Sequence, residues 1–279
     1  MTGLRAGKAQ GVPDRSQESG SSRGRTSPVT SDDRRRGWPA WSAVRQDDGV
    51  SALTDGMTAV IFDFYGTLTP VSPAQAWAGN AARLADVFGA PPDALVRVLD
   101  DSFPERISGA LGDVAQTMQV VAQRLGVTLT PGQLAEAAAT RRAVQEAMFA
   151  LRPEALAVIR DLRARGLKIG LVSDCTSELP DAWARLPLAA LVDAPVFSCV
   201  ERTRKPDPAL FLAAASRLSV DPAGCLYIGD GGGRELTGAS ALGMRAVLLA
   251  GPDWRGEHSS EADWTGPRIS SLTQLTGAG

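Results

Sequence analysis

The chain has 279 residues, of which 44% are hydrophobic, and this length suits one large domain or a core domain with a smaller insertion. A formal net charge of −2 gives no reason to expect nucleic acid or an anionic membrane surface as the main partner. The sequence contains no run of about 18 apolar residues and no apolar stretch near its N-terminus, so we expect neither a membrane span nor a secretory signal.

Cysteine and histidine usage narrows the chemistry further. Cys175, Cys199 and Cys225 are scattered and lack CxxC spacing, which is typical of buried thiols in a reducing compartment, so we expect a cytoplasmic protein. With His258 as the single histidine, a Ser-His-Asp triad or a multi-histidine zinc site is hard to build. The oligomeric state cannot be predicted from these features.

The first 56 residues differ in composition from the rest of the chain. They are rich in Gly, Ser, Arg, Asp and Pro and lack apolar periodicity, so we predict a disordered N-terminal tail over residues 1–56. Met57 stands just before the first predicted strand. We therefore hypothesise that Met57 is the natural start, or that the residues before it are dispensable.

Strands and helices alternate after the tail, with one long helical interruption. Residues 59–64 form a short apolar run, as expected of a parallel strand buried on both faces. Residues 71–150 are predicted to be helical throughout, with Ser72-Pro73 and Thr130-Pro131 as helix starts. Further strands are expected at 167–173, 195–199, 225–229 and 245–250. The pattern predicts an α/β fold, with a Rossmann-like parallel sheet core built from 57–70 and 151–279 and an inserted all-helical subdomain over 71–150.

Polar side chains gather where these strands end, and the carboxyl edge of a parallel sheet is where ligands bind. They are Asp63, Tyr65 and Thr67 after the first strand, Ser173 and Asp174 after the second, Lys205 before a later helix, and Asp230 and Glu235 after a further strand. A carboxylate such as Asp63 can attack phosphorus or carbon and form a covalent intermediate. Asp63 and Asp230 can share a Mg²⁺ ion with Glu235 in support. Lys205 can balance their charge, and Ser173 with nearby N–H groups can donate to phosphate oxygens.

In order and spacing these residues resemble the haloacid dehalogenase superfamily over about residues 58–250. The matching motifs are Asp63-Phe64-Tyr65-Gly66-Thr67-Leu68, then Ser173, then Lys205-Pro206-Asp207-Pro208, and finally Gly229-Asp230 with Glu235 five residues on. The resemblance implies that Asp63 is the nucleophile, that the Thr67 hydroxyl orients it, and that Asp230 is the metal ligand with Glu235 as its partner. It also implies phosphate binding by Ser173 with its neighbour Asp174, charge balance by Lys205, and a metal ligand in the backbone carbonyl of Tyr65. The helical block at 71–150 resembles the helical cap of the family, a lid that chooses the substrate.

Tyr65 departs from the phosphatase pattern, which has at this position a second Asp that protonates the leaving group. Loss of a general acid/base typically slows a reaction by about 10²–10⁴-fold, and a phenol of ordinary pKa near 10 is a poor base. The dehalogenases of the superfamily have Tyr here and need no metal. Because Asp230 and Glu235 follow the phosphatase arrangement, we favour a Mg²⁺-dependent small-molecule phosphatase with an aspartyl-phosphate intermediate.

Two alternatives remain open: a metal-independent 2-haloacid dehalogenase, and a slow or non-catalytic phosphate binder. A phosphorylated substrate with a good leaving group, such as an acyl phosphate, would need less help from an acid. The residues that choose the substrate are sought near Trp77, Arg83 and Arg106 of the helical block.

Overall fold

The computed structural model describes residues 53–71, 74–256 and 259–277, with the backbone alone over 74–80. Most of the predicted tail therefore lies outside the described residues. Among the helices of the described part, none is long and apolar enough to cross a membrane.

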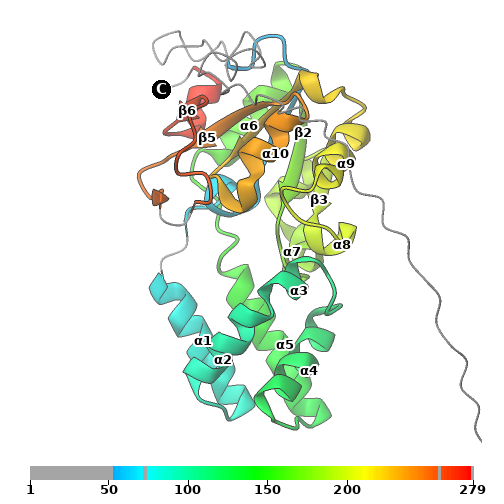
Figure 1. Cartoon of the computed structure of the whole chain (residues 1–279), viewed down its shortest axis with the longest axis vertical. Helices are drawn as coiled ribbons and strands as arrows, with labels where there is room; N and C mark the ends of the chain where they lie inside the picture. The colour runs from blue at the N-terminus through cyan, green and yellow to red at the C-terminus, as the bar shows by residue number, and fades with distance from the viewer. Residues whose placement is uncertain (1–52, 72–73, 257–258, 278–279) are drawn as a thin grey trace, which may run out of the picture. The chain divides into compact units, whose positions relative to one another are not determined.

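A six-stranded parallel sheet forms the centre of the fold (Figure 1). Its strands are β1 (Ala59–Phe62), β2 (Lys168–Ser173), β3 (Ala194–Phe197), β4 (Cys225–Gly229), β5 (Arg245–Leu249) and β6 (Arg268–Ile269). The order β3-β2-β1-β4-β5-β6 puts β1 in the interior, paired with β2 on one side and β4 on the other. The predicted α/β fold with a parallel sheet is confirmed.

Alternation along β1 explains how the sheet is covered on both faces. Val60 and Phe62 face a cluster that includes helix α6 (Ala155–Ala164) and the C-terminal turn at Leu272–Leu275. Ala59 and Ile61 face the opposite cluster, which includes α9 (Pro208–Leu218) and α10 (Glu235–Ala241). All four residues of β1 are fully buried, as expected of a strand between two helical layers.

Two details of the sheet differ from the sequence-based expectation. The strand predicted at 195–199 ends at Phe197, because the short helix α8 (Ser198–Glu201) begins there. Strand β6 was not predicted, because two residues are too few to give an alternating pattern.

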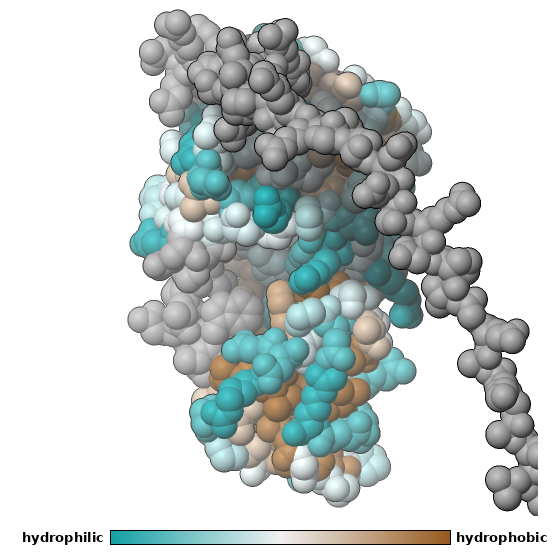
Figure 2. Space-filling model, in the orientation of Figure 1, coloured by the Kyte–Doolittle hydropathy of each residue, from teal (hydrophilic) through white to brown (hydrophobic). Residues whose placement is uncertain are grey.

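Between the turn at Phe64–Leu68 and α6, the regular elements of the described residues are all helices. They are α1 (Ala74–Phe88), α2 (Pro92–Asp101), α3 (Phe103–Ile107), α4 (Val114–Leu125) and α5 (Pro131–Glu146). Capping boxes begin two of them: the side chain of Asp113 accepts from Gln116 N–H, and that of Thr130 accepts from Gln133 N–H. Helices α1, α2, α4 and α5 share their own apolar cluster. On the face seen in Figure 2, brown apolar residues of this segment lie between teal hydrophilic ones.

The folded core begins before the predicted boundary at residue 57. Leu53 is buried in the core cluster that includes α6, and Thr54 is also buried. Arg245 donates to the Leu53 carbonyl at 2.7 Å, and Arg165 donates to the Thr54 hydroxyl at 2.6 Å. Leu53 and Thr54, which the sequence analysis assigned to the tail, therefore pack against the core in the described part of the chain.

One arginine ties together the two chain crossings between the helical segment and the core. The backbone N–H of Arg152 donates to the Leu68 carbonyl at 2.8 Å. The segment that leaves the core and the segment that returns to it therefore lie side by side. The Arg152 guanidinium donates to the carbonyls of Gly66 and Thr67 and to both carboxylate oxygens of Asp253, each at 2.9 Å. Asp253 in turn accepts from the N–H of Val71 at 2.7 Å.

Candidate active site

Asp63 is presented by the centre of the sheet. It directly follows β1, and its backbone N–H donates to the Ile228 carbonyl of β4 at 2.9 Å. The chain then makes a wide helical turn (Phe64–Leu68) in which Gly66 has φ = 75°. A Cβ at Gly66 would stand 2.3 Å from Oδ2 of Asp230, so only glycine lets this turn approach Asp230 so closely.

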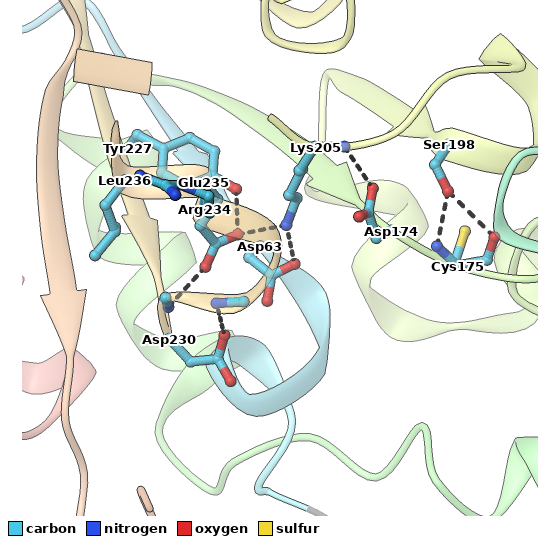
Figure 3. A network of polar contacts seen from close by, with 12 residues as sticks. Asp63, Asp174, Cys175, Ser198, Lys205, Tyr227, Asp230, Arg234, Glu235 and Leu236 are labelled. Atoms are coloured by element: carbon cyan, nitrogen blue, oxygen red, sulfur yellow. Dashed lines mark hydrogen bonds and ion pairs between the residues drawn. The ribbon is translucent and has the colours of Figure 1, made fainter. Parts of the chain in front are cut away.

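Lys205 connects the nucleophile to the acidic residue of the last motif (Figure 3). Its Nζ lies 2.5 Å from Oδ1 of Asp63 and also forms a short ion pair with Oε2 of Glu235. The lysine side chain is 3% exposed, so this triad is shielded from water. Burial lowers the pKa of Lys205, but the negative charges of Asp63 and Glu235 outweigh it and hold that pKa well above its usual value. The ammonium group therefore stays charged.

The backbone of Lys205 is held by Asp174, whose Oδ1 accepts from the Lys205 N–H at 3.0 Å. Asp174 was predicted to bind substrate together with Ser173. In the structure one of its carboxylate oxygens is taken up by the Lys205 backbone, and substrate binding by Asp174 stays a prediction.

Glu235 is fully buried, and both of its oxygens are engaged. Oε1 accepts from the N–H of Gly231 at 3.0 Å, and Oε2 accepts from the Tyr227 hydroxyl at 2.8 Å as well as from Lys205. A Cβ at Gly229 would lie 2.0 Å from Oε1, so the glycine makes room for this carboxylate. Tyr227 was missed by the sequence analysis, because an aromatic residue inside an apolar strand looks like ordinary core.

The carboxylates of Asp63, Asp230 and Glu235 each offer an oxygen within 4.8 Å of the others. Burial is the main cause that raises the pKa of all three, to about 7 for Asp63, about 6 for Asp230 and about 7 for Glu235. Negative neighbours add to this: Glu235 raises the pKa of Asp63, and Asp63 raises that of Asp230. Three crowded acids with one ammonium are short of positive charge, and oxygen ligands suit Mg²⁺, so these residues fit that ion.

Two hydroxyls next to this cluster are buried without a partner among the described residues. They are Oγ1 of Thr67 and Oγ of Ser173, each on a fully buried residue. Buried hydroxyls are normally hydrogen-bonded, so these two, in the turn after β1 and at the end of β2, are available to a ligand. Both were singled out from the sequence.

The surroundings of Tyr65 do not suit a general base. Its ring packs edge-on against Phe64, with centroids 4.9 Å apart, and tilts against Phe149 at 6.4 Å. Burial, followed by the nearby Cys175 and Glu178, raises the pKa of its phenol well above 10. The phenol therefore stays protonated at neutral pH.

The helical segment meets the core through a buried ion pair. Nε of Arg141 on α5 lies 2.6 Å from Oε1 of Glu178 on α7 (Glu178–Ala182), with side chains only 5% and 2% exposed. Burial opposes the charge of Glu178, but Arg141 keeps its pKa below the ordinary value. Arg106 is also buried and donates to the Leu99 carbonyl at 2.7 Å, whereas Arg83 is exposed. The side chain of Trp77 lies outside the described residues.

Comparison with known families places this site in context. A family model for haloacid dehalogenase-like hydrolases matches residues 57–243, more than half of the chain. The chain therefore belongs to the haloacid dehalogenase-like hydrolases, and the predicted family and enzyme class are confirmed.

Among individual relatives, the chain is 27% identical over 193 residues to a glyceraldehyde 3-phosphate phosphatase of Methanopyrus kandleri, covering 68% of this chain and 83% of that enzyme. It is 33% identical over 202 residues to a phosphoglycolate phosphatase of Cereibacter sphaeroides, covering 69% and 85%. A match to the bovine haloacid dehalogenase-like hydrolase domain-containing protein 3, 37% identical over 97 residues, spans 35% of this chain and only 39% of that protein.

A solved structure, the 2-haloacid dehalogenase from Pseudomonas syringae pv. Tomato DC3000, superposes with a TM-score of 0.61 at 24% identity, covering 80% of this chain and 97% of that one. At this identity the likeness shows a shared fold.

Proposed function

We propose that the protein is a Mg²⁺-dependent phosphatase that acts on a small phosphorylated molecule through an aspartyl-phosphate on Asp63. The observation that carries the proposal is the carboxylate of Asp230 beside Asp63. A second negative charge at this place opposes ionisation of the nucleophile unless a cation is present. A metal-free dehalogenase has no use for it, whereas a phosphatase uses it to hold the cation. Two of the relatives above carry phosphatase names, which agrees with this choice.

The reaction has two steps, both centred on Asp63. A carboxylate oxygen of Asp63 attacks phosphorus, forming the acyl phosphate while the bond to the leaving oxygen breaks. Water then attacks the same phosphorus, releases inorganic phosphate and restores the carboxylate. Ser173 donates its free hydroxyl to a phosphoryl oxygen, and Lys205 balances the negative charge that gathers there.

Mg²⁺, when bound, would be held by Asp63, Asp230 and the carbonyl of residue 65 with Glu235 in support, and would supply positive charge to the phosphoryl oxygens.

Tyr65 limits which phosphates react well. With a phenol pKa well above 10, Tyr65 is a weak acid toward a departing alkoxide. The proposed substrate therefore has a leaving group that needs little protonation, such as the carboxylate of an acyl phosphate. The helical segment at 71–150 is proposed as the cap, which chooses the substrate and excludes water during the reaction.

Release of phosphate from acetyl phosphate and an aryl phosphate, and of chloride from 2-chloropropionate, tests the proposal in Mg²⁺ and in EDTA. We expect Mg²⁺-dependent phosphate release that is lost in Asp63→Asn and retained in Asp93→Asn, a matched change on the exposed face of α2. Tyr65→Asp should raise the rate on a phosphate ester with a poor leaving group, because it supplies the absent acid.

Chloride release that persists in EDTA would instead establish the dehalogenase, the alternative that Tyr65 favours. Retained binding of Mg²⁺ and phosphate without turnover on any phosphate tested would establish the non-catalytic binder.

A further inference from the structure

Two of the three cysteines lie side by side at one end of the sheet. The Sγ atoms of Cys175 and Cys199 are 4.0 Å apart, and both thiols are free. The pairing of β2 with β3 explains this approach, because Ser173 at the end of β2 lies opposite Phe197 at the end of β3. Cys175 follows Ser173 by two residues, and Cys199 follows Phe197 by two residues. Paired strands lie about 4.8 Å apart, so this register brings the two chain segments beyond the strand ends close enough for their thiols to meet.

A buried serine fixes the two segments against each other. The Ser198 hydroxyl accepts from the Cys175 N–H at 2.9 Å and donates to the Cys175 carbonyl at 3.2 Å (Figure 3). Ser198 is the residue directly before Cys199 and is fully buried. The contact between the thiols is therefore supported by two hydrogen bonds between the Ser198 side chain and the main chain of Cys175.

We propose that Cys175 and Cys199 form a peroxide-reactive dithiol that closes into an intramolecular disulfide beside the active site. Cys199 is partly exposed and meets the oxidant first, whereas Cys175 is only 2% exposed and acts as the resolving thiol. The hydrogen bond from the Cys175 thiol lowers the pKa of Cys199, which favours this order.

The reaction balances with hydrogen peroxide as the oxidant. The Cys199 thiolate attacks one peroxide oxygen, which forms an S–O bond, breaks the O–O bond and releases hydroxide. Sulfur is thereby oxidised by two electrons to the sulfenic acid. The Cys175 thiol then attacks that sulfur, the S–S bond forms as the S–O bond breaks, and its proton leaves with the hydroxyl as water.

Closing the disulfide would pull on the catalytic residues. The two sulfurs must approach from 4.0 Å to about 2.0 Å. Cys175 directly follows Asp174, the carboxylate that holds the Lys205 backbone. On the other side the Cys199 carbonyl packs closely on Gly109 of the helical segment, where a Cβ would lie 2.0 Å from it. A misplacement of about 1 Å can slow an enzyme by about 10²-fold, so we expect at least a tenfold fall in kcat.

Peptide mapping of the full-length chain tests the disulfide without any assay of activity. The reduced protein, freed of reductant, is treated with hydrogen peroxide, digested without reduction and analysed by mass spectrometry. We expect one cross-linked pair of peptides that contain residues 175 and 199, a loss of two hydrogens, and full reversal by dithiothreitol. Cys225→Ser provides the matched control and should react like the wild type, whereas Cys199→Ser should leave Cys175 reduced.

Accumulation of Cys199 as sulfinic acid, cross-links between two chains, or thiols unchanged by peroxide would each overturn the dithiol. The activity readout rests on the proposed phosphatase function and is taken from the same samples. A cross-linked enzyme with undiminished phosphate release would overturn the link to the active site. A reduced enzyme without any activity would count against the proposed function alone, since the mapping still decides the disulfide.

Discussion

Asp230→Asn isolates the contribution of the acidic cluster to stability. The substitution removes a negative charge but keeps the oxygen that accepts from the Gly232 N–H at 3.0 Å. In the wild type, burial and then the charge of Asp63 raise the pKa of Asp230 from 3.8 to about 6. An acid with a raised pKa binds its proton more tightly in the folded state, so its stabilising effect is complete below the unfolded pKa and is lost as pH rises through the folded one.

The size of the effect follows from that shift. A change of two pKa units corresponds to about 3 kcal/mol at most, of which about 1.5 kcal/mol is lost between pH 5 and pH 8. The free energy of unfolding of the metal-free protein is measured with urea at pH 5 and at pH 8. The decrease between the two pH values should be smaller by about 1.5 kcal/mol in Asp230→Asn than in the wild type.

Addition of Mg²⁺ sharpens this test. A bound cation favours the ionised carboxylates, so Mg²⁺ should flatten the pH dependence of the wild type and act less on Asp230→Asn. The exposed change Asp93→Asn should follow the wild type. An equal pH dependence in the wild type and Asp230→Asn would refute the reasoning. So would a free energy of unfolding of the wild type at pH 8 that does not change when Mg²⁺ is added.

Three further changes test how the site is built. Leu53→Ala should lower the free energy of unfolding by about 2–5 kcal/mol in urea titrations, because Leu53 is buried in the core cluster. Gly66→Ala should abolish phosphate release, since its Cβ would stand 2.3 Å from an oxygen of Asp230. Arg141→Met should lower the free energy of unfolding by about 3–5 kcal/mol, because it leaves the buried charge of Glu178 unpaired.

Each of these changes has a matched control. Leu212→Ala removes an exposed leucine from α9 and should change stability by less than about 0.5 kcal/mol. Gly89→Ala carries the same strain of positive φ, with no atom within 4 Å of its Cβ, and should keep full activity. Exchange of both Arg141 and Glu178 for methionine should restore part of the lost stability. A double variant no better than Arg141→Met, or an active Gly66→Ala enzyme, would contradict these expectations.

The sheet and most of the site residues could be predicted because their signals are local. Asp63, Ser173 and Asp230 each follow a short apolar run, and parallel strands bring such ends to one edge. Tyr227 gave no such signal, because it lies inside an apolar strand and its bond to Glu235 depends on how α10 packs.

Contacts between distant segments were the part that could not be predicted. Arg152 and Asp253 are separated by 101 residues, and neither stands in a recognisable pattern. Leu53 belongs to a few apolar residues between polar ones that show no regular spacing, so periodicity could not assign it to the core. The hydrogen bond from the Lys205 N–H to Asp174 likewise depends on two loops that meet only in the folded chain.

The clamp formed by Arg152 has a mechanical consequence for the proposed cap. Arg152 joins the segment that leaves the core to the segment that returns to it, through bonds to the carbonyls of Gly66 and Thr67. Both residues lie within four positions of the nucleophile. The positions of Gly66 and Thr67 relative to the core are thereby tied to Arg152 and Asp253, so a displacement of the proposed cap beyond these hydrogen bonds would leave the turn that carries Asp63 in place.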